Sequence, residues 1–299
     1  MIRKLIKQGS GTYTISLPIK WIRRNEVLDS NYIYVKEKGS NLIISRFKRD
    51  TKTITLDINN NDSSWLRTYL ASYYRLGYKN LILNFKNTYD LNQIEKILES
   101  LMGYEIINST KKSIEIEDIL FLNSHKSQDI IIKMFQTISS LYNLLNEKEK
   151  SKSNKNIESK NFKKNILKLR DYALRLIRLE NTRFSYEWYT IVVFLEKISG
   201  EIYKLNSIEK NINEESIKHL KKSFSDLLIL KDIFLKKDSQ KIIDFHLKIL
   251  DKDRKTYIQE ISKNINSIVY SSSHRITHFL HAITSRLQII YLSQDSDNK

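Results

Sequence analysis

The segment that decides the fold is SYEWYTIVVFLEKISGEIYKL, which runs from Ser185 to Leu205. Its apolar residues recur at steps of three and four, which at ~100° per residue gathers them on one face of a helix. The residues on this face are Trp188, Ile191, Val192, Leu195, Ile198, Ile202 and Leu205. Similar periodic segments lie on both sides, so the sequence predicts a helical assembly between Ser127 and Leu292 with this segment buried inside it.

The composition is that of a folded cytoplasmic protein. The chain has 299 residues, of which 40% are hydrophobic and 28% are charged, and this length predicts two or three domains. No apolar run approaches the ~18 residues of a spanning helix and no signal-type segment begins the chain, so we expect no membrane insertion. The absence of cysteine excludes disulfides and thiolate chemistry.

The formal net charge of +17 has two interpretations. One is an acidic partner, which would be nucleic acid, an anionic membrane face or an acidic protein. The other is an AT-rich genome, whose codons favour lysine, asparagine and isoleucine. The charge alone does not separate these interpretations.

The first 46 residues carry strand signals around one short helix. In TYTISLP, apolar and polar residues alternate, and Pro18 ends that strand and suits the entry to the helix IKWIRRNEV. YIYVKEK and NLIISRF follow as two strands around a turn at Gly39-Ser40. About 45 residues cannot bury both faces of such a module alone, so we expect it to dimerise.

This order of elements resembles the AbrB/SpoVT swapped-hairpin family, through RKLIKQGSGTYTISLPIKWIRRNEV, YIYV and NLIIS. The resemblance covers about the first 47 residues and implies a domain over 1–50 in which two chains interlock into one β-barrel. It also implies binding of double-stranded DNA through basic residues. These are Arg3, Lys4, Lys7, Lys20, Arg23 and Arg24.

Two points bear on that DNA binding. The six basic residues would neutralise phosphates with little sequence reading, and the alternative is a solvated basic face. DNA-binding members of the family often have an arginine after the turn glycine, where this chain has Ser10-Gly11-Thr12. That departure favours a module that mainly dimerises.

Residues 51–120 predict a small α/β (ferredoxin-like) domain. Strand and helix signals alternate in the order β-α-β-α-β-β, with the run Asn59 to Asp62 as turn and N-cap, Asp90 as a second helix cap, and Gly77 and Gly103 as helix stops. No glycine-rich phosphate loop or nucleophile elbow is present. The side chains of Arg67, Arg75 and Tyr78 either line a ligand surface, or they are ordinary side chains that are solvated or packed against the fold.

The sequence predicts an all-α domain over residues 121–299. The chain as a whole is therefore predicted to be an α+β multidomain protein. A lysine-rich run, EKEKSKSNKNIESK, predicts a flexible loop between the first two helices. Six helices in this length form either two three-helix bundles or one elongated bundle. The predicted helices are Ser127–Glu149, Ser159–Glu180, Ser185–Ser207, Asn213–Lys236, Asp238–Asn264 and Asn266–Leu292.

Three stretches of this half resemble the PhoU family: LRDYALRLIR at 169–178, LEKISGEI at 195–202 and HRITHFLHAI at 274–283. The resemblance implies tandem three-helix bundles that restrain phosphate uptake by contacting a phosphate transporter ATPase or a sensor kinase. Together with the N-terminal resemblance, nearly the whole chain is similar to the archaeal phosphate-uptake regulators.

Many PhoU proteins bind metal through Glu-x-x-x-Asp pairs, and this chain departs from that pattern. Glu196 is kept, but Gly200 stands four residues on with Glu201 beside it, and His274 and His278 occupy the acidic positions of the second repeat. Two histidines at this spacing suit zinc, iron or nickel.

A divalent transition metal would further need Asp171 or another carboxylate nearby. The helical wheel places His274, His278 and His281 roughly opposite the core stripe. That stripe comprises Ile276, Phe279, Leu280, Ile283, Leu287 and Ile290. The alternative to a metal site is therefore a solvated or interfacial histidine cluster.

The sequence is compatible to different degrees with three classes of function. The leading one is a homodimeric regulator of phosphate uptake that acts through protein–protein contacts. The alternative is a DNA-binding transcriptional regulator whose helices sense or oligomerise. An enzyme is disfavoured, because no paired carboxylates, phosphate-cradling glycines or histidine with an acidic orienter stand out in the sequence.

Overall fold

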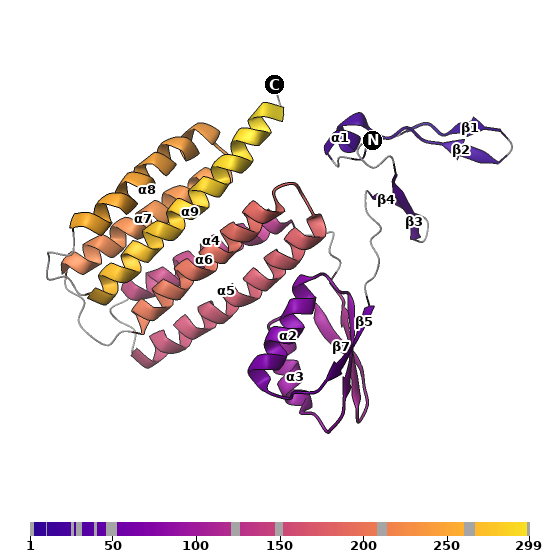
Figure 1. Ribbon diagram of the computed structural model, residues 1–299, viewed down its shortest axis with the longest axis horizontal. Coiled ribbons are helices and arrows are strands. Elements are labelled where there is room, and N and C mark those ends of the chain that lie inside the picture. The colour runs from indigo at the N-terminus through magenta and orange to yellow at the C-terminus, as the bar shows by residue number, and fades with distance from the viewer. Residues whose placement is uncertain are drawn as a thin grey trace. The chain divides into compact units, whose positions relative to one another are not determined.

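The computed structural model describes residues 3–9, 11–24, 27, 32–38, 41–45, 53–120, 126–146, 152–207, 214–259 and 267–297. The chain divides into two compact units, Met1–Thr51 and Lys52–Lys299. It is a mixed α+β protein with a helical C-terminal part, as predicted (Figure 1). The second unit holds both the predicted α/β segment and the predicted helices.

The first unit contains two antiparallel ribbons and a short helix, in the predicted order. The N–H groups of Trp21 and Ile22 donate to the carbonyl of Pro18, which starts the helix at the residue that ends the preceding extended segment. The elements are β1 (Ile6–Gln8), β2 (Thr12–Thr14), α1 (Ile19–Arg24), β3 (Tyr34–Lys38) and β4 (Asn41–Ser45). Strands β1 and β2 pair, as do β3 and β4.

The first unit has almost no core of its own. Among its described side chains only Val27 is buried. Its exposed large apolar side chains are Leu5, Ile6, Tyr13, Ile15, Ile19, Tyr32, Ile33, Tyr34, Val35 and Leu42. The described residues form no closed barrel within one chain, and the predicted turn at Gly39-Ser40 lies outside them. The swapped-hairpin barrel therefore stays a prediction.

The second unit begins with a four-stranded sheet covered on one face by two helices (Figure 1). The sheet order is β5-β6-β8-β7, with β5 parallel to β6 and β8 antiparallel to both of its neighbours. The elements are β5 (Thr53–Ile58), α2 (Ser63–Arg75), β6 (Asn80–Phe85), α3 (Leu91–Leu98), β7 (Tyr104–Ser109) and β8 (Ser113–Asp118). This order differs from the β-α-β-β-α-β order of ferredoxin-like domains, so that part of the prediction is corrected.

Predicted residues fix the starts of both helices and the end of α2. The Asp62 carboxylate accepts from the Trp65 N–H at 2.8 Å, and that of Asp90 accepts from the Asn92 N–H at 3.0 Å. Gly77 follows the C-cap of α2, whereas α3 ends at Leu98, five residues before the predicted stop at Gly103. Both glycines have positive φ, +86° and +92°, a conformation that favours glycine. At Gly103 a Cβ atom would also lie 2.7 Å from the Asp118 side chain.

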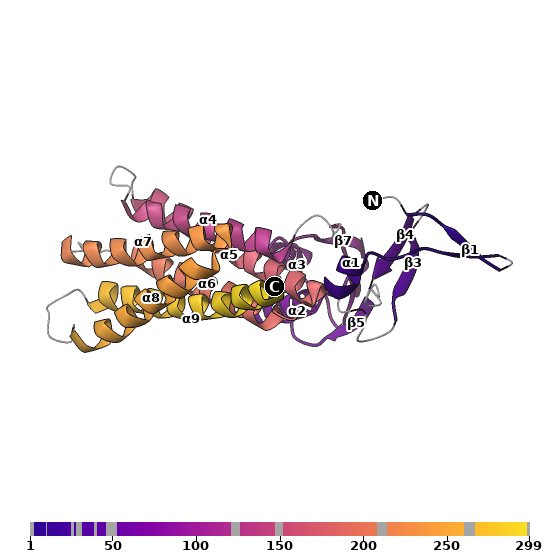
Figure 2. The same ribbon diagram turned by 90° about the horizontal axis from the view of Figure 1, so that it is seen from above.

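Six helices form the rest of the second unit and pack together in one bundle, whose first three and last three helices we call the two triplets (Figure 2). Helices α4, α5 and α6 contact one another, α9 contacts both α7 and α8, and α6 joins the triplets by packing along α9. All seven side chains predicted for the buried face of α6 are buried. The helices are α4 (Ser127–Asn146), α5 (Lys152–Glu180), α6 (Ser185–Asn206), α7 (Glu214–Lys236), α8 (Ser239–Gln259) and α9 (Ser267–Asp297).

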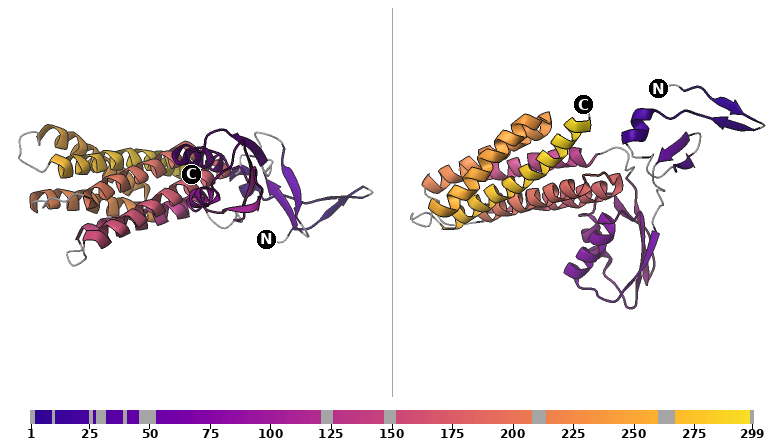
Figure 3. Two further views of the ribbon diagram at one scale, coloured as in Figure 1. Left: turned by 90° about the horizontal axis from the view of Figure 1, so that it is seen from below. Right: turned by 45° about the horizontal axis from the view of Figure 1, so that its top comes forward.

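Two of these six helices, which Figure 3 shows from two further sides, extend beyond their predicted bounds. Helix α5 begins at Lys152, inside the stretch predicted as a flexible loop, because lysine is a good helix former and Ser159 and Phe162 pack inward. Helix α9 continues to Asp297 instead of ending at Leu292. No described helix has the length and apolar character needed to cross a membrane.

Candidate functional site

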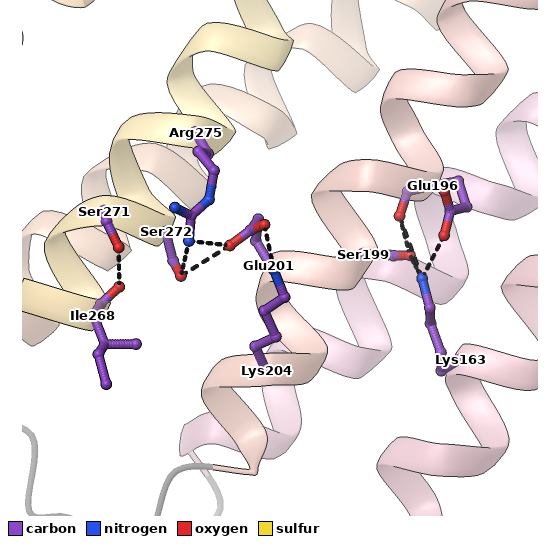
Figure 4. Close-up of polar contacts among 9 residues, drawn as sticks. All are labelled: Lys163, Glu196, Ser199, Glu201, Lys204, Ile268, Ser271, Ser272 and Arg275. Carbon is purple, nitrogen blue, oxygen red and sulfur yellow. Dashed lines mark hydrogen bonds and ion pairs between the residues drawn. The ribbon is translucent and has the colours of Figure 1, made fainter.

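Glu196 of α6 is neutralised by a lysine of the neighbouring helix (Figure 4). The Lys163 Nζ on α5 lies 2.6 Å from Glu196 Oε1 and 3.2 Å from Ser199 Oγ. Ser199 is buried, and it donates to the Glu196 carbonyl at 2.6 Å. The protein's own ammonium group therefore stands beside the carboxylate that the PhoU resemblance assigns to a metal.

Glu201, the other acidic residue of that segment, joins α6 to α9 (Figure 4). Its carboxylate accepts from Arg275 at 2.8 Å, from Ser272 Oγ at 3.0 Å and from Lys204 at 3.0 Å. Burial by itself would raise the pKa of Glu201, but the bonds from Arg275, Lys204 and Ser272 together hold it below its ordinary value. Glu201 therefore stays ionised and fastens the two triplets together.

Glu201→Gln is expected to destabilise the fold at neutral pH by about 1–3 kcal/mol, because it weakens charge-assisted bonds to a nearly buried carboxylate. The folded pKa of Glu201 is depressed, so its contribution is present above the ordinary glutamate pKa and is lost as the pH falls through the folded value. The gap in melting temperature between the wild type and this variant should thus shrink on acidification. A gap that stayed constant down to low pH would contradict this assignment.

Asp171 of α5 is fully buried and is held by arginines. Arg75 of α2 approaches its Oδ1 at 2.7 Å and Arg170 approaches it at 2.9 Å, while Arg67 lies 4.0 Å from Oδ2. Asp171, a predicted metal ligand, therefore lies at the contact between α5 and α2. Arg67 and Arg75, which the sequence left open as ligand-lining or packed, take part in this contact.

Arg175, one turn further along α5, is the residue that sequence reasoning missed. It is fully buried, and its Nη2 donates to Asp118 Oδ2 at 2.7 Å and to the Tyr78 carbonyl at 2.8 Å, while Nη1 donates to the Tyr74 carbonyl. Its guanidinium lies over the rings of Tyr74 and Tyr104. Burial raises the pKa of Tyr104 to about 12, even though Arg175 acts to lower it.

The histidines of α9 lie on a less exposed face than the sequence predicted. His278 is exposed as expected, but His274 and His281 are half-buried. The His281 ring lies 5.0 Å from that of His246 on α8, whose Nδ1 is 2.8 Å from Thr284 Oγ1. Burial and the neighbouring His281 lower the pKa of His246, which favours the neutral form of the His246 ring.

The predicted metal ligands are not brought together in the part of the chain that the structure describes. No three histidine, aspartate or glutamate side chains there form a group that could hold a metal ion. Asp171, Glu196 and Glu201 instead each face lysine or arginine. The metal site therefore stays a prediction.

The predicted DNA-binding residues are all exposed, on β1, on α1 or in the segment that begins the described chain. Arg23 and Arg24 form the last turn of α1. Comparison with protein-family models, with curated proteins and with solved structures finds no match to this chain. Function is therefore argued from the residues and the fold.

Proposed function

We propose that the chain is a homodimeric regulator of phosphate uptake that acts by contacting other proteins. The N-terminal unit pairs with that of a second copy, and the helical triplets offer their surfaces to a phosphate transporter ATPase or a sensor kinase. Support comes from the stretches similar to AbrB/SpoVT and PhoU sequences. The structural observation that carries the proposal is the packing of six helices as two triplets joined through α6 and α9.

The dimer part of the proposal rests on the exposed apolar surface of the first unit. A module with one buried side chain among those described lacks the apolar burial that stabilises a fold. A second copy supplies the same apolar surface and can cover it across a two-fold axis. Protein–protein contact needs no metal at the acidic positions Asp171, Glu196 and Glu201, each of which is paired with lysine or arginine.

Deletion of the gene in its own host tests the regulatory role. Cells without the protein should take up labelled phosphate faster than the parent when phosphate is plentiful, and a plasmid copy should restore the restraint. The purified complex should contain a phosphate transporter ATPase or a sensor kinase. Uptake that is unchanged at both high and low phosphate would overturn the proposal.

The second candidate is a DNA-binding transcriptional regulator, and the exposure of six basic side chains in the first unit favours it. Lysine and arginine that neutralise phosphates release counterions, so the logarithm of affinity falls with the logarithm of salt by about 0.9 per phosphate contact. The N-terminal unit would then hold DNA mainly through its backbone.

Arg23→Gln with Arg24→Gln is expected to lower the salt slope of DNA binding by about two and to weaken affinity for every sequence alike. Fluorescence anisotropy with a labelled duplex over a range of salt concentrations measures both quantities. Lys197→Gln, an exposed change on α6, is the matched control and should leave the slope unchanged. A wild-type affinity that does not respond to salt would remove the DNA-binding candidate.

A further inference from the structure

The four-stranded sheet has two edges that differ in their protection. At the β7 edge the register with β8 shifts between Ile106 and Asn108, and such bulges keep an edge from pairing with another strand. At the β5 edge six residues pair with β6 in unbroken register. None of the described residues pairs with the outer side of β5, and the strand carries no proline or lysine to block pairing.

The side chains of β5 alternate strictly between the two faces of the sheet. Thr53, Thr55 and Asp57 are exposed, whereas Leu56 and Ile58 are buried and Ile54 packs against the core. The covered face carries α2 and α3, and no described element of this unit covers the other, open face (Figure 1). A strand added to this edge must keep the alternation, because a slip of one residue would put Leu56 on the open face.

An aromatic ladder lies on α2 beside this edge. Trp65, Tyr69 and Tyr73 follow one another at steps of four residues, with ring centroids 4.6 and 5.1 Å apart. Trp65 is 38% exposed although it is a large aromatic residue. On the helical wheel the ladder lies on the flank of α2 away from Arg67 and Arg75, whose side chains reach Asp171 on α5.

The ladder lies on the β5 side of the helix. Tyr74, on the other side of α2, donates from its hydroxyl to the Met102 carbonyl at 2.7 Å and packs edge-on against Tyr104 of β7. Strand β7 is at the edge of the sheet opposite β5, so the flank of α2 that carries the ladder faces the β5 edge.

We propose that β5 pairs antiparallel with β5 of a second copy of this chain, about a two-fold axis at Thr55. The two sheets then form one sheet of eight strands with the helices on one face. Thr53 lies opposite Asp57 of the second copy, and Ile54 lies opposite its Leu56. No like charges face each other, the threonine hydroxyl can donate to the carboxylate, and every apolar side chain stays on the covered face.

The aromatic ladder fits the same arrangement. Strands in a sheet lie ~4.8 Å apart, and a crossover helix covers the two strands it joins. The two copies of α2 are then separated by two strand spacings, ~9.6 Å, which falls within the ~8–10 Å of packed helices. The ladders of the two copies fill this contact, which explains why Trp65 is exposed in a single chain.

Cysteine cross-linking tests the proposal cleanly, because the chain has no cysteine of its own. Residues directly opposite in an antiparallel pair have Cα atoms ~4.5–5.5 Å apart, within the ~4.4–6.8 Å that a disulfide spans. Full-length Thr55→Cys should therefore oxidise to a covalent dimer at least about tenfold faster than Asn108→Cys, an exposed control on β7 of the same sheet. The double variant Thr55→Cys with Asp57→Cys also forms a disulfide if the two-fold axis lies at Leu56, because Thr55 then lies opposite Asp57 of the second copy.

Equal cross-linking at the two edges, or none at β5 in either variant, would overturn the proposal. A second measurement needs no variant. Amide hydrogen exchange of β5 in the unaltered chain should slow as protein concentration rises, whereas that of β7 should not. Exchange at β5 that does not change across the concentrations over which the chain passes from monomer to dimer would also overturn it. Neither outcome bears on the phosphate-uptake role, which is judged by transport in the deletion strain.

Discussion

Replacing Arg175 with methionine is expected to lower the free energy of unfolding by about 3–5 kcal/mol. The change removes the guanidinium that donates to Asp118 and to the carbonyls of Tyr74 and Tyr78. Asp118 is only 3% exposed, so its charge would remain buried with the Leu120 N–H as its remaining donor in the described contacts. Urea denaturation followed by circular dichroism measures the loss.

Two further variants separate this mechanism from a loss of packing. Arg178→Met changes an exposed arginine three residues further along α5 and should shift stability by no more than about 0.5 kcal/mol. Arg175→Met combined with Asp118→Asn removes both charges and should be more stable than Arg175→Met alone. A double variant that is as unstable as the sum of its parts would show that the ion pair is not the cause.

Replacing Leu195 with alanine is expected to cost about 2–5 kcal/mol of stability, because it opens a cavity in the middle of α6. Leu195 is fully buried on the face by which α6 packs in the core. The melting temperature should fall by several degrees, and calorimetry measures it. Lys197→Ala, two residues along on the exposed side of the same helix, should leave it nearly unchanged. A small change in melting temperature for Leu195→Ala would mean that α6 does not lie at the centre of the helical core.

The elements of the fold were largely readable from the sequence because their signals are local. The step of three and four residues placed α6, and its seven core residues are buried as predicted. Capping by Asp62 and Asp90 placed the starts of α2 and α3, and the stop at Gly77 placed the end of α2 within one or two residues, whereas α3 ends at Leu98, five residues before the predicted stop at Gly103. Each of these signals depends on residues within one turn of the chain.

The polar contacts of the candidate sites were less predictable because their partners are far apart in sequence. Asp171 meets Arg75 across 96 residues, and Arg175 meets Asp118 across 57. A family resemblance that assigns Glu196 to a metal, and the need for a further carboxylate such as Asp171, cannot reveal that lysine and arginine lie beside both residues here. One signal was available: Arg175 lies within the apolar run YALRLI, where a charged residue needs a buried partner.

Helix α5 is one uninterrupted helix that contacts three other elements of the second unit, namely α6, α2 and β8. At 1.5 Å per residue its 29 residues extend ~44 Å. In its first half Lys163 bonds to α6, and in its second half Asp171 and Arg175 bond to α2 and β8. A tilt of the sheet would therefore tilt α5 as a rigid body and shift its contact with α6, because no hinge interrupts the helix between these contacts.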